Sequence, residues 1–192
     1  MNADRPSHSS ACGFSLIEIV IGLVVLSFLG IVGVNMISGS VSTNQVISNA
    51  QLAYSSARYA LDRISREIRE IKYDVSTNTI GITSASNMTA SKLVFTQTGA
   101  NSSSKLVTLT YTPPNASVPG YILLTYDSNQ SSMIANNLSN PIGIFSYIQD
   151  DGSTSASDPS TLRYVRIDLS VKPDSTKNQV LALSNLVVIR NK

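Results

Sequence analysis

One acidic side chain, Glu18, lies inside a long apolar stretch, and its surroundings imply specific chemistry. Residues 14–37 are almost entirely apolar, and at about 24 residues they exceed the ~20 needed to cross a bilayer as a helix. A carboxylate there costs about 2.5–3.5 kcal/mol at the bilayer centre and less near an edge, so Glu18 needs a cationic partner. Cleavage of the Gly13–Phe14 bond would create that partner, because the new ammonium of Phe14 would lie one helical turn from Glu18. At ~4 Å and an effective dielectric near 20 the two charges attract by about 4 kcal/mol before desolvation, which is comparable to the cost.

The rest of the chain offers little for catalysis. The only histidine, His8, and the only cysteine, Cys12, precede the Gly13–Phe14 bond, and the sequence contains no Gly-x-Ser-x-Gly motif. No nucleophile therefore has a base at a recognisable spacing. We expect that the protein is not an enzyme and uses no cofactor.

A loop with three carboxylates is the only candidate for metal binding. Asp150, Asp151 and Asp158 supply oxygen ligands of the kind that calcium takes. Their spacing does not match an EF-hand, and Asp151-Gly152 is an ordinary turn sequence. A structural turn is the favoured interpretation, with calcium binding as the alternative.

Composition excludes some partners. The net charge is +2 and only 14% of residues are charged, so no basic patch predicts nucleic acid binding. Removal of residues 1–13 takes away Asp4 and Arg5 together and leaves this balance unchanged. The chain after Gly13 contains no cysteine, so we expect no internal disulfide.

The sequence Gly13-Phe14-Ser15-Leu16-Ile17-Glu18 resembles the class III signal of type IV prepilins and type II secretion pseudopilins. The resemblance implies that a prepilin peptidase cuts after Gly13, that Phe14 becomes the N-methylated first residue, and that Glu18 makes the assembly salt bridge with Phe14 of a neighbouring subunit. An uncleaved signal anchor of an unrelated protein is the alternative, but such an anchor gains nothing from an early carboxylate. The resemblance also implies a single pass through the inner membrane, with the N-terminus cytoplasmic and the body periplasmic, before transfer to a pilus or pseudopilus.

The helical pattern continues beyond the apolar segment. Ala57, Leu61, Ile64, Ile68 and Ile71 recur at spacings of four and three, which predicts one apolar face packed on a sheet. The opposite face carries Arg58, Asp62, Arg63, Arg66, Glu67, Arg69 and Glu70. Within it, Asp62–Arg66 and Arg63–Glu67 are spaced as ion pairs worth about 0.2–0.5 kcal/mol each. We therefore predict one helix over residues 14–72, in which Gly30 and Gly33 indicate either close helix packing or a place where the helix loosens.

The pattern of residues 74–192 predicts β-structure. Candidate strands with turn sequences between them cover Lys92–Thr96, Lys105–Thr112, Tyr121–Tyr126, Gly143–Ile148, Leu162–Lys172 and Val180–Ile189. We predict an α+β, pilin-like fold with a leader at 1–13, a transmembrane and assembly segment at 14–37, an amphipathic helical segment at 38–73 and a β-rich domain at 74–192.

Residues 57–69 further resemble the helix of minor pilins of the PilW and MshO type and of J-type pseudopilins. This resemblance implies a low-abundance subunit near the tip of a type IV pilus, with other pilin subunits, the prepilin peptidase and the inner-membrane assembly platform as partners. The alternatives are a J-like minor pseudopilin of a type II secretion system, a major pilin, or a membrane-anchored adhesin.

Overall fold

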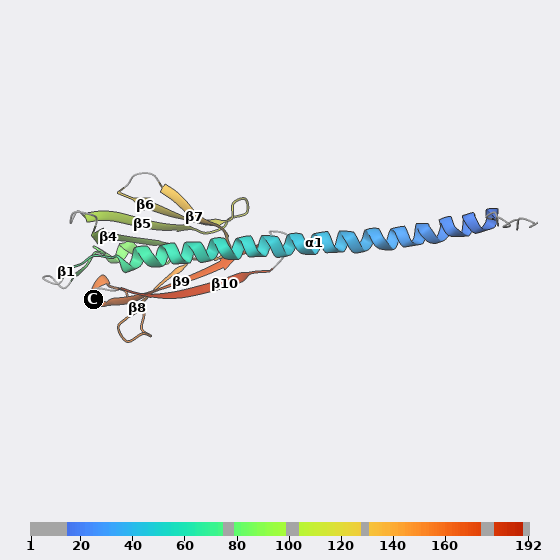
Figure 1. The fold of residues 1–192 in the computed structure, drawn as a ribbon. Helices are drawn as coiled ribbons and strands as arrows, with labels where there is room; N and C mark the ends of the chain where they lie inside the picture. Colours follow the sequence, from blue (N-terminus) through green and yellow to red (C-terminus); the bar gives the residue numbers. More distant parts are fainter. Residues whose placement is uncertain (1–14, 75–78, 99–103, 128–130, 174–178, 190–192) are drawn as a thin grey trace, which may run out of the picture. The chain divides into compact units, whose positions relative to one another are not determined.

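The computed structural model describes residues 15–74, 79–98, 104–127, 131–173 and 179–189, and these form one long helix and an antiparallel β domain (Figure 1). The chain divides into two compact units, one ending at Gln45 and the other beginning at Val46. The first unit contains the apolar part of the helix. The second contains the rest of the helix and all the strands. An α+β class is therefore confirmed.

The single helix, α1, spans Leu16–Arg69. It begins where the Ser15 carbonyl accepts the backbone N–H groups of Glu18 and Ile19, and it ends in a tight turn in which Ile71 N–H donates to Ile68 O. Arg66 and Arg69 lie in the last turn, where cations are favoured by the helix dipole. The predicted helix over 14–72 was slightly too long at its C-terminal end, because Ile71 forms a β-bridge with Gln97 and Lys72 N–H donates to Thr96 O at 2.8 Å.

The predicted apolar face of the helix is buried. Ala57, Leu61, Ile64 and Ile68 are at most 6% exposed, and Ile71 just beyond the helix is fully buried. Burying a side chain of this size contributes roughly 1.5–3 kcal/mol. This face therefore holds the second half of α1 on the β domain, as the spacing predicts.

The β domain contains one large and one small antiparallel sheet. Strand order in the large sheet is β10-β9-β7-β6-β5-β4-β3, with β8 also paired to β9, and β1 and β2 form the small sheet. The strands are β1 Tyr73–Asp74, β2 Thr79–Ile80, β3 Met88–Thr89, β4 Lys92–Thr98, β5 Ser104–Thr112, β6 Gly120–Tyr126, β7 Ser131–Leu138, β8 Phe145–Gln149, β9 Leu162–Val171 and β10 Leu181–Val188, with short 3-10 turns at Ala85–Asn87 and Pro159–Thr161. All six predicted strands are present, although β8 begins two residues later than predicted.

Strand β7 was not predicted from the sequence. Its residues are mostly small and polar, and its burial does not alternate cleanly. The pairing with β6 shifts register twice, and Asn137 adopts a positive φ of 57°. A bulged strand of this kind lacks the period-two pattern on which sequence-based strand prediction depends.

The large sheet curls so that its early and late strands meet. The carbonyl of Ala90, after β3, accepts the N–H groups of Ile144 (2.8 Å) and Phe145 (3.0 Å) at the start of β8. Gly143 permits this approach, because an added Cβ would lie 2.3 Å from the Ala90 oxygen. The core lies between the curled sheet and α1, and β9 supplies Val165, Ile167, Leu169 and Val171 to it.

Candidate functional site

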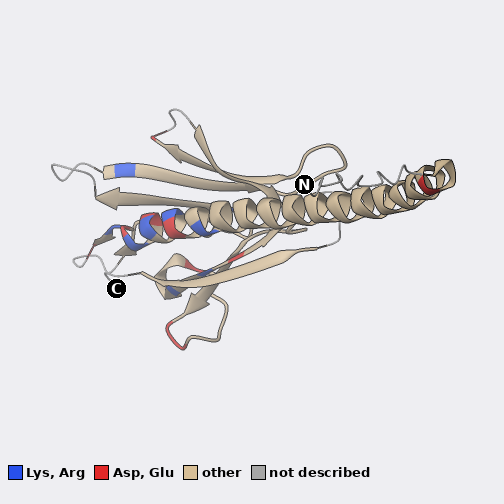
Figure 2. Ribbon diagram, turned by 45° about the vertical axis from the view of Figure 1, so that its right-hand side comes forward, with Lys and Arg blue, Asp and Glu red and all other residues tan. Residues whose placement is uncertain are grey.

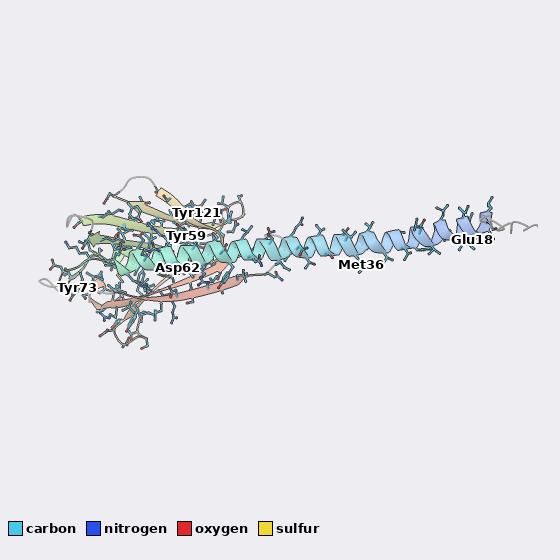
Figure 3. The ribbon with its side chains drawn as sticks, in the orientation of Figure 1. Glu18, Met36, Tyr59, Asp62, Tyr73 and Tyr121 are labelled. Atoms are coloured by element: carbon cyan, nitrogen blue, oxygen red, sulfur yellow. The ribbon has the colours of Figure 1, made fainter. Side chains whose placement is uncertain are left out.

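Glu18 lies in the first turn of α1, at the end of the helix that begins the described chain (Figure 3). Its backbone N–H donates to the Ser15 carbonyl at 3.0 Å, and its side chain is exposed. A negative charge in the first turn is stabilised by the helix dipole by about 0.3–1 kcal/mol. Among the described residues no cation lies within ion-pair distance of this carboxylate. The arrangement leaves Glu18 able to bind a cation from another group or another chain.

Gly13 and Phe14, the predicted cleavage and methylation residues, lie outside the described residues. Their geometry relative to Glu18 is therefore a prediction that follows from the sequence and from the helix start at Leu16.

The segment of α1 that follows Glu18 is apolar and exposed. An 18-residue window in this helix reaches a mean hydropathy of 2.7 with none of it buried, so α1 is long and apolar enough to cross a membrane by length and composition. Large side chains such as Leu26 (67%) and Phe28 (68%) are open to the surroundings. The segment remains helical through Gly30 and Gly33, and a Cβ at either glycine would meet nothing within 4 Å in the described chain. An exposed apolar surface of this extent is typical of a site of contact with lipid or with other protein.

Charged residues are concentrated on the last turns of α1 (Figure 2). There, Glu67 is only 5% exposed, although its position in the sequence predicts the wet face. Its carboxylate accepts bonds from Arg63 Nη2 at 2.8 Å and from the Tyr126 hydroxyl at 2.6 Å. Gln97 Nε2 donates to the other carboxylate oxygen at 2.8 Å. The assignment of Glu67 to the solvent face was therefore wrong, because strands β4 and β6 bring partners over it.

Tyr126 links the two charges of this buried network. Arg63 also donates to the Tyr126 hydroxyl at 2.6 Å, and Lys105 Nζ lies 3.5 Å from the centre of the Tyr126 ring. Burial raises the pKa of Tyr126, and the hydrogen bond to Glu67 raises it further, while Arg63 opposes the rise. Burial alone would lower the pKa of Arg63, but the bond to Tyr126 and the charge of Glu67 leave it raised. The raised pKa keeps Tyr126 neutral near pH 7, and the hydrogen bonds of the network hold the last turns of α1 on the sheet.

Of the two ion pairs predicted on this helix, only Arg63–Glu67 is present. Asp62 and Arg66, which are both described and exposed, do not form the second one. The i,i+4 spacing predicted the Arg63–Glu67 pair. Nothing in the sequence predicts that Tyr126 and Gln97 are partners of this pair, because both lie far away in the chain.

The loop with Asp151 is a turn stabilised by its own backbone. The Asp151 carboxylate accepts the N–H groups of Ser153 (3.0 Å) and Thr154 (2.9 Å) and the Thr154 hydroxyl, and these bonds lower its pKa to about 2. Asp158 instead caps a 3-10 turn by accepting Ser160 N–H at 2.7 Å. Asp150 lies 3.5 Å from Arg163. Each carboxylate has a separate role, and among the described residues no three His, Cys, Asp or Glu side chains are grouped to hold a metal.

The fold and these contacts define a class: a chain with a helix apolar enough to span a membrane, joined to an antiparallel β domain on which the end of that helix is packed. Comparison with protein-family models, with curated proteins and with solved structures finds no match to this chain.

Proposed function

We propose that this protein is a minor type IV pilin-like subunit. It is made as a precursor, cut between Gly13 and Phe14 by a prepilin peptidase, methylated at Phe14, and incorporated near the tip of a pilus, where it aids assembly. The observation that carries the proposal is Glu18 in the first turn of an exposed apolar helix whose other end is fixed on a β domain.

The position of Glu18 gives the assembly step its chemistry. In the inner membrane the apolar segment is covered by lipid, and in a filament it is covered by the helices of neighbouring subunits. A carboxylate transferred into that apolar core without a partner is strongly disfavoured, by about 3–5 kcal/mol for a broken buried pair. A pair between Glu18 and a Phe14 ammonium avoids this cost, and although a pair within one helix would also do so, we propose the pair with Phe14 of a neighbour, as the resemblance implies. The single acid therefore selects one axial register for the incoming subunit.

The second half of α1 connects this register to the β domain. The buried face that includes Ile64 and the network around Glu67 hold the helix at one rotation on the sheet. The β domain lies on the periplasmic side before assembly and on the surface of the filament afterwards.

Mass spectrometry of the mature N-terminus tests the processing step. We expect a chain that begins with methylated Phe14. A chain with Met1 intact, or one cut beyond Ile37, would refute the proposal.

Replacement of Glu18 tests the assembly step. Glu18→Ala should still insert and be cleaved, because the apolar segment and the cleavage site are intact, but should be incorporated poorly. The matched control is Ser27→Ala, which removes another polar group from the same segment, a hydroxyl bonded only to the Leu23 carbonyl of its own helix at 2.8 Å. Normal incorporation of Glu18→Ala would remove Glu18 from the assembly role.

The same helix sequence supports a J-like minor pseudopilin of a type II secretion system as the second candidate. Deletion of the protein separates the two, since loss of pili with normal exoprotein release favours the pilin, and the reverse favours the pseudopilin. Many copies along each fibre would indicate a major pilin. Loss of surface binding with normal fibres would indicate an adhesin.

A further inference from the structure

A groove lies between α1 and the end of the large sheet at which β7 meets β9. It consists of two adjoining hollows of about 590 Å³ and 670 Å³, which have Asn49, Asn137 and Pro173 in common. Hollows of a few hundred Å³ are of the size that holds small-molecule ligands. All the residues that line the groove belong to the compact unit that begins at Val46, so its shape does not depend on the apolar segment of the helix.

The first hollow has an apolar wall with an exposed aromatic ring. Leu52 and Tyr59 are seven residues apart, about two helical turns, and they line the hollow from the same side of α1. Each of these side chains is 65% exposed. Tyr59 lies on the half of α1 that packs on the β domain (Figure 3), and in the described part of the chain its hydroxyl has no hydrogen-bond partner. Much of the ring is therefore available to a ligand.

Side-chain amides line the same hollow from both sides. Asn49 belongs to α1, Asn136 and Asn137 belong to β7, and none of their amides bonds to another described residue. Successive side chains of a regular strand point to opposite faces. The positive φ of 57° at Asn137 interrupts that alternation, so Asn136 and Asn137 both line the groove. Irregularities of this kind re-aim side chains next to functional sites, and here they gather hydrogen-bonding groups around an apolar wall.

The chemistry of the lining disfavours three kinds of ligand. Among the described residues no charged side chain lines the first hollow, and Lys172 alone does so in the second, so a charged ligand finds little to pair with. A wholly apolar ligand would cover the amides without giving them hydrogen bonds. A peptide held by its backbone needs free backbone groups, but here Lys172 N–H already donates to Asn137 O at 3.1 Å. The remaining class is an uncharged ligand with an apolar face and a rim of polar groups.

We propose that this groove binds a neutral carbohydrate chain. The C–H groups on one face of a sugar ring pack on the Tyr59 ring, because the face of an aromatic ring is electron-rich and C–H hydrogens carry a small positive charge. The sugar hydroxyls exchange hydrogen bonds with Asn136 and Asn137, because hydroxyls and amides both donate and accept. The second hollow continues the groove for a further sugar. This inference goes beyond the proposed function, since it assigns a ligand to the β domain and does not involve Glu18.

Three substitutions test the site in the full-length chain. Tyr59→Ala removes the ring and Tyr59→Phe keeps it, while Asn137→Gly removes an amide at a φ that glycine adopts without strain. The matched control is Tyr54→Ala, which removes another exposed tyrosine (47%) from the same helix but outside the groove. The purified chain is kept in a detergent without a sugar headgroup, because glucoside and maltoside detergents would compete for the site.

Binding is measured by titration calorimetry with neutral tetrasaccharides of glucose, galactose, mannose and N-acetylglucosamine, and with the corresponding monosaccharides. We expect at least one tetrasaccharide to bind more tightly than its monosaccharide. Tyr59→Ala should raise its Kd by about tenfold, and Asn137→Gly should raise it by about three- to tenfold. Tyr59→Phe and Tyr54→Ala should leave it unchanged. In saturation-transfer NMR the largest signals should come from C–H protons on one face of a sugar ring, and they should weaken in Tyr59→Ala.

Several results would overturn the inference. These are no binding of any neutral tetrasaccharide, a monosaccharide that binds as tightly as its tetrasaccharide, or equal losses for Tyr59→Ala and Tyr54→Ala. Binding that requires a sulfated or sialylated sugar, or displacement of the sugar by an uncharged peptide with higher affinity, would assign the groove to a different ligand and overturn it as well. Failure of the chain to be cleaved or incorporated would instead refute the proposed function, and it would not affect sugar binding by the purified chain.

Discussion

Replacing Glu67 by alanine should destabilise the β domain far more than replacing Asp62, although both acids are on the same helix and both are spaced for an ion pair. The Glu67 side chain is 6% exposed and that of Arg63 is 33% exposed. Glu67→Ala leaves Arg63, Tyr126 and Gln97 without their shared acceptor. Breaking a buried pair costs about 3–5 kcal/mol, and because Arg63 can turn toward water we expect the lower end, about 3 kcal/mol. Asp62→Ala removes an exposed side chain that forms no ion pair with the described residues and should change stability by less than about 0.5 kcal/mol.

The assay is thermal unfolding of the full-length chain in detergent, followed by near-UV circular dichroism of its tyrosines, since the protein contains no tryptophan. For a chain of this size each kcal/mol shifts Tm by about 2–4 °C, so Glu67→Ala should lower it by about 6–12 °C. Glu67→Gln keeps the size of the side chain and should fall between the two alanine variants. Equal Tm values for Glu67→Ala and Asp62→Ala would refute the reasoning that the buried network, and not helix spacing, determines the contribution of each acid.

Three other perturbations follow from the structure. Ile64→Ala, at a fully buried site, should lower the free energy of unfolding measured by chemical denaturation by about 2–5 kcal/mol. Ile47→Ala, at a site 49% exposed, should lower it far less. Similar losses for the two variants would contradict packing of the predicted apolar face on the sheet. Burial raises the pKa of Tyr111 from 10.0 to about 12. The contribution of the neutral hydroxyl to the free energy of unfolding is therefore complete below pH 10, and it is lost between pH 10 and 12 by up to about 1.4 kcal/mol per pH unit. The Tm measured across this range should fall less steeply for Tyr111→Phe than for the unmodified chain. Gly143→Ala would place a Cβ 2.3 Å from the Ala90 carbonyl oxygen and should lower Tm by several degrees, and an unchanged Tm would show that the closure of the sheet tolerates a side chain there.

Much of the fold was predictable because periodicity is local. The spacing of Ile64 and Ile68 predicts the buried face of α1, and the alternation of Val165 with Arg166 predicts the buried face of β9; both are confirmed. Strand β7 could not be predicted in this way. Its register is set by a bulge and by pairing with β6, and both depend on tertiary contacts and not on its own pattern.

The candidate site also contains features that local sequence predicts and features that depend on tertiary contacts. Glu18 was singled out from the sequence because a carboxylate in an apolar run is visible in the residues alone, and the structure places it in the first turn of α1. Its role in assembly stays a prediction. Glu67 was assigned to the wrong face because the residues that bury it, Gln97 and Tyr126, come from distant strands. The position of β10 at the end of the large sheet was also invisible in the sequence, since strand order cannot be read from the pattern of one strand.

The late position of β9 in the chain has a consequence for biosynthesis. This strand joins β7, β8 and β10, and it begins only at Leu162. At about 5–20 residues per second, the ribosome needs roughly 5–20 s to reach it after Ile64 has been made. Throughout that interval the sheet on which the helix packs is incomplete, because β4 and β6 are already made but β9 and β10 are not. A stop codon before residue 162 would leave a fragment without β9 and β10, which quality-control proteases should remove.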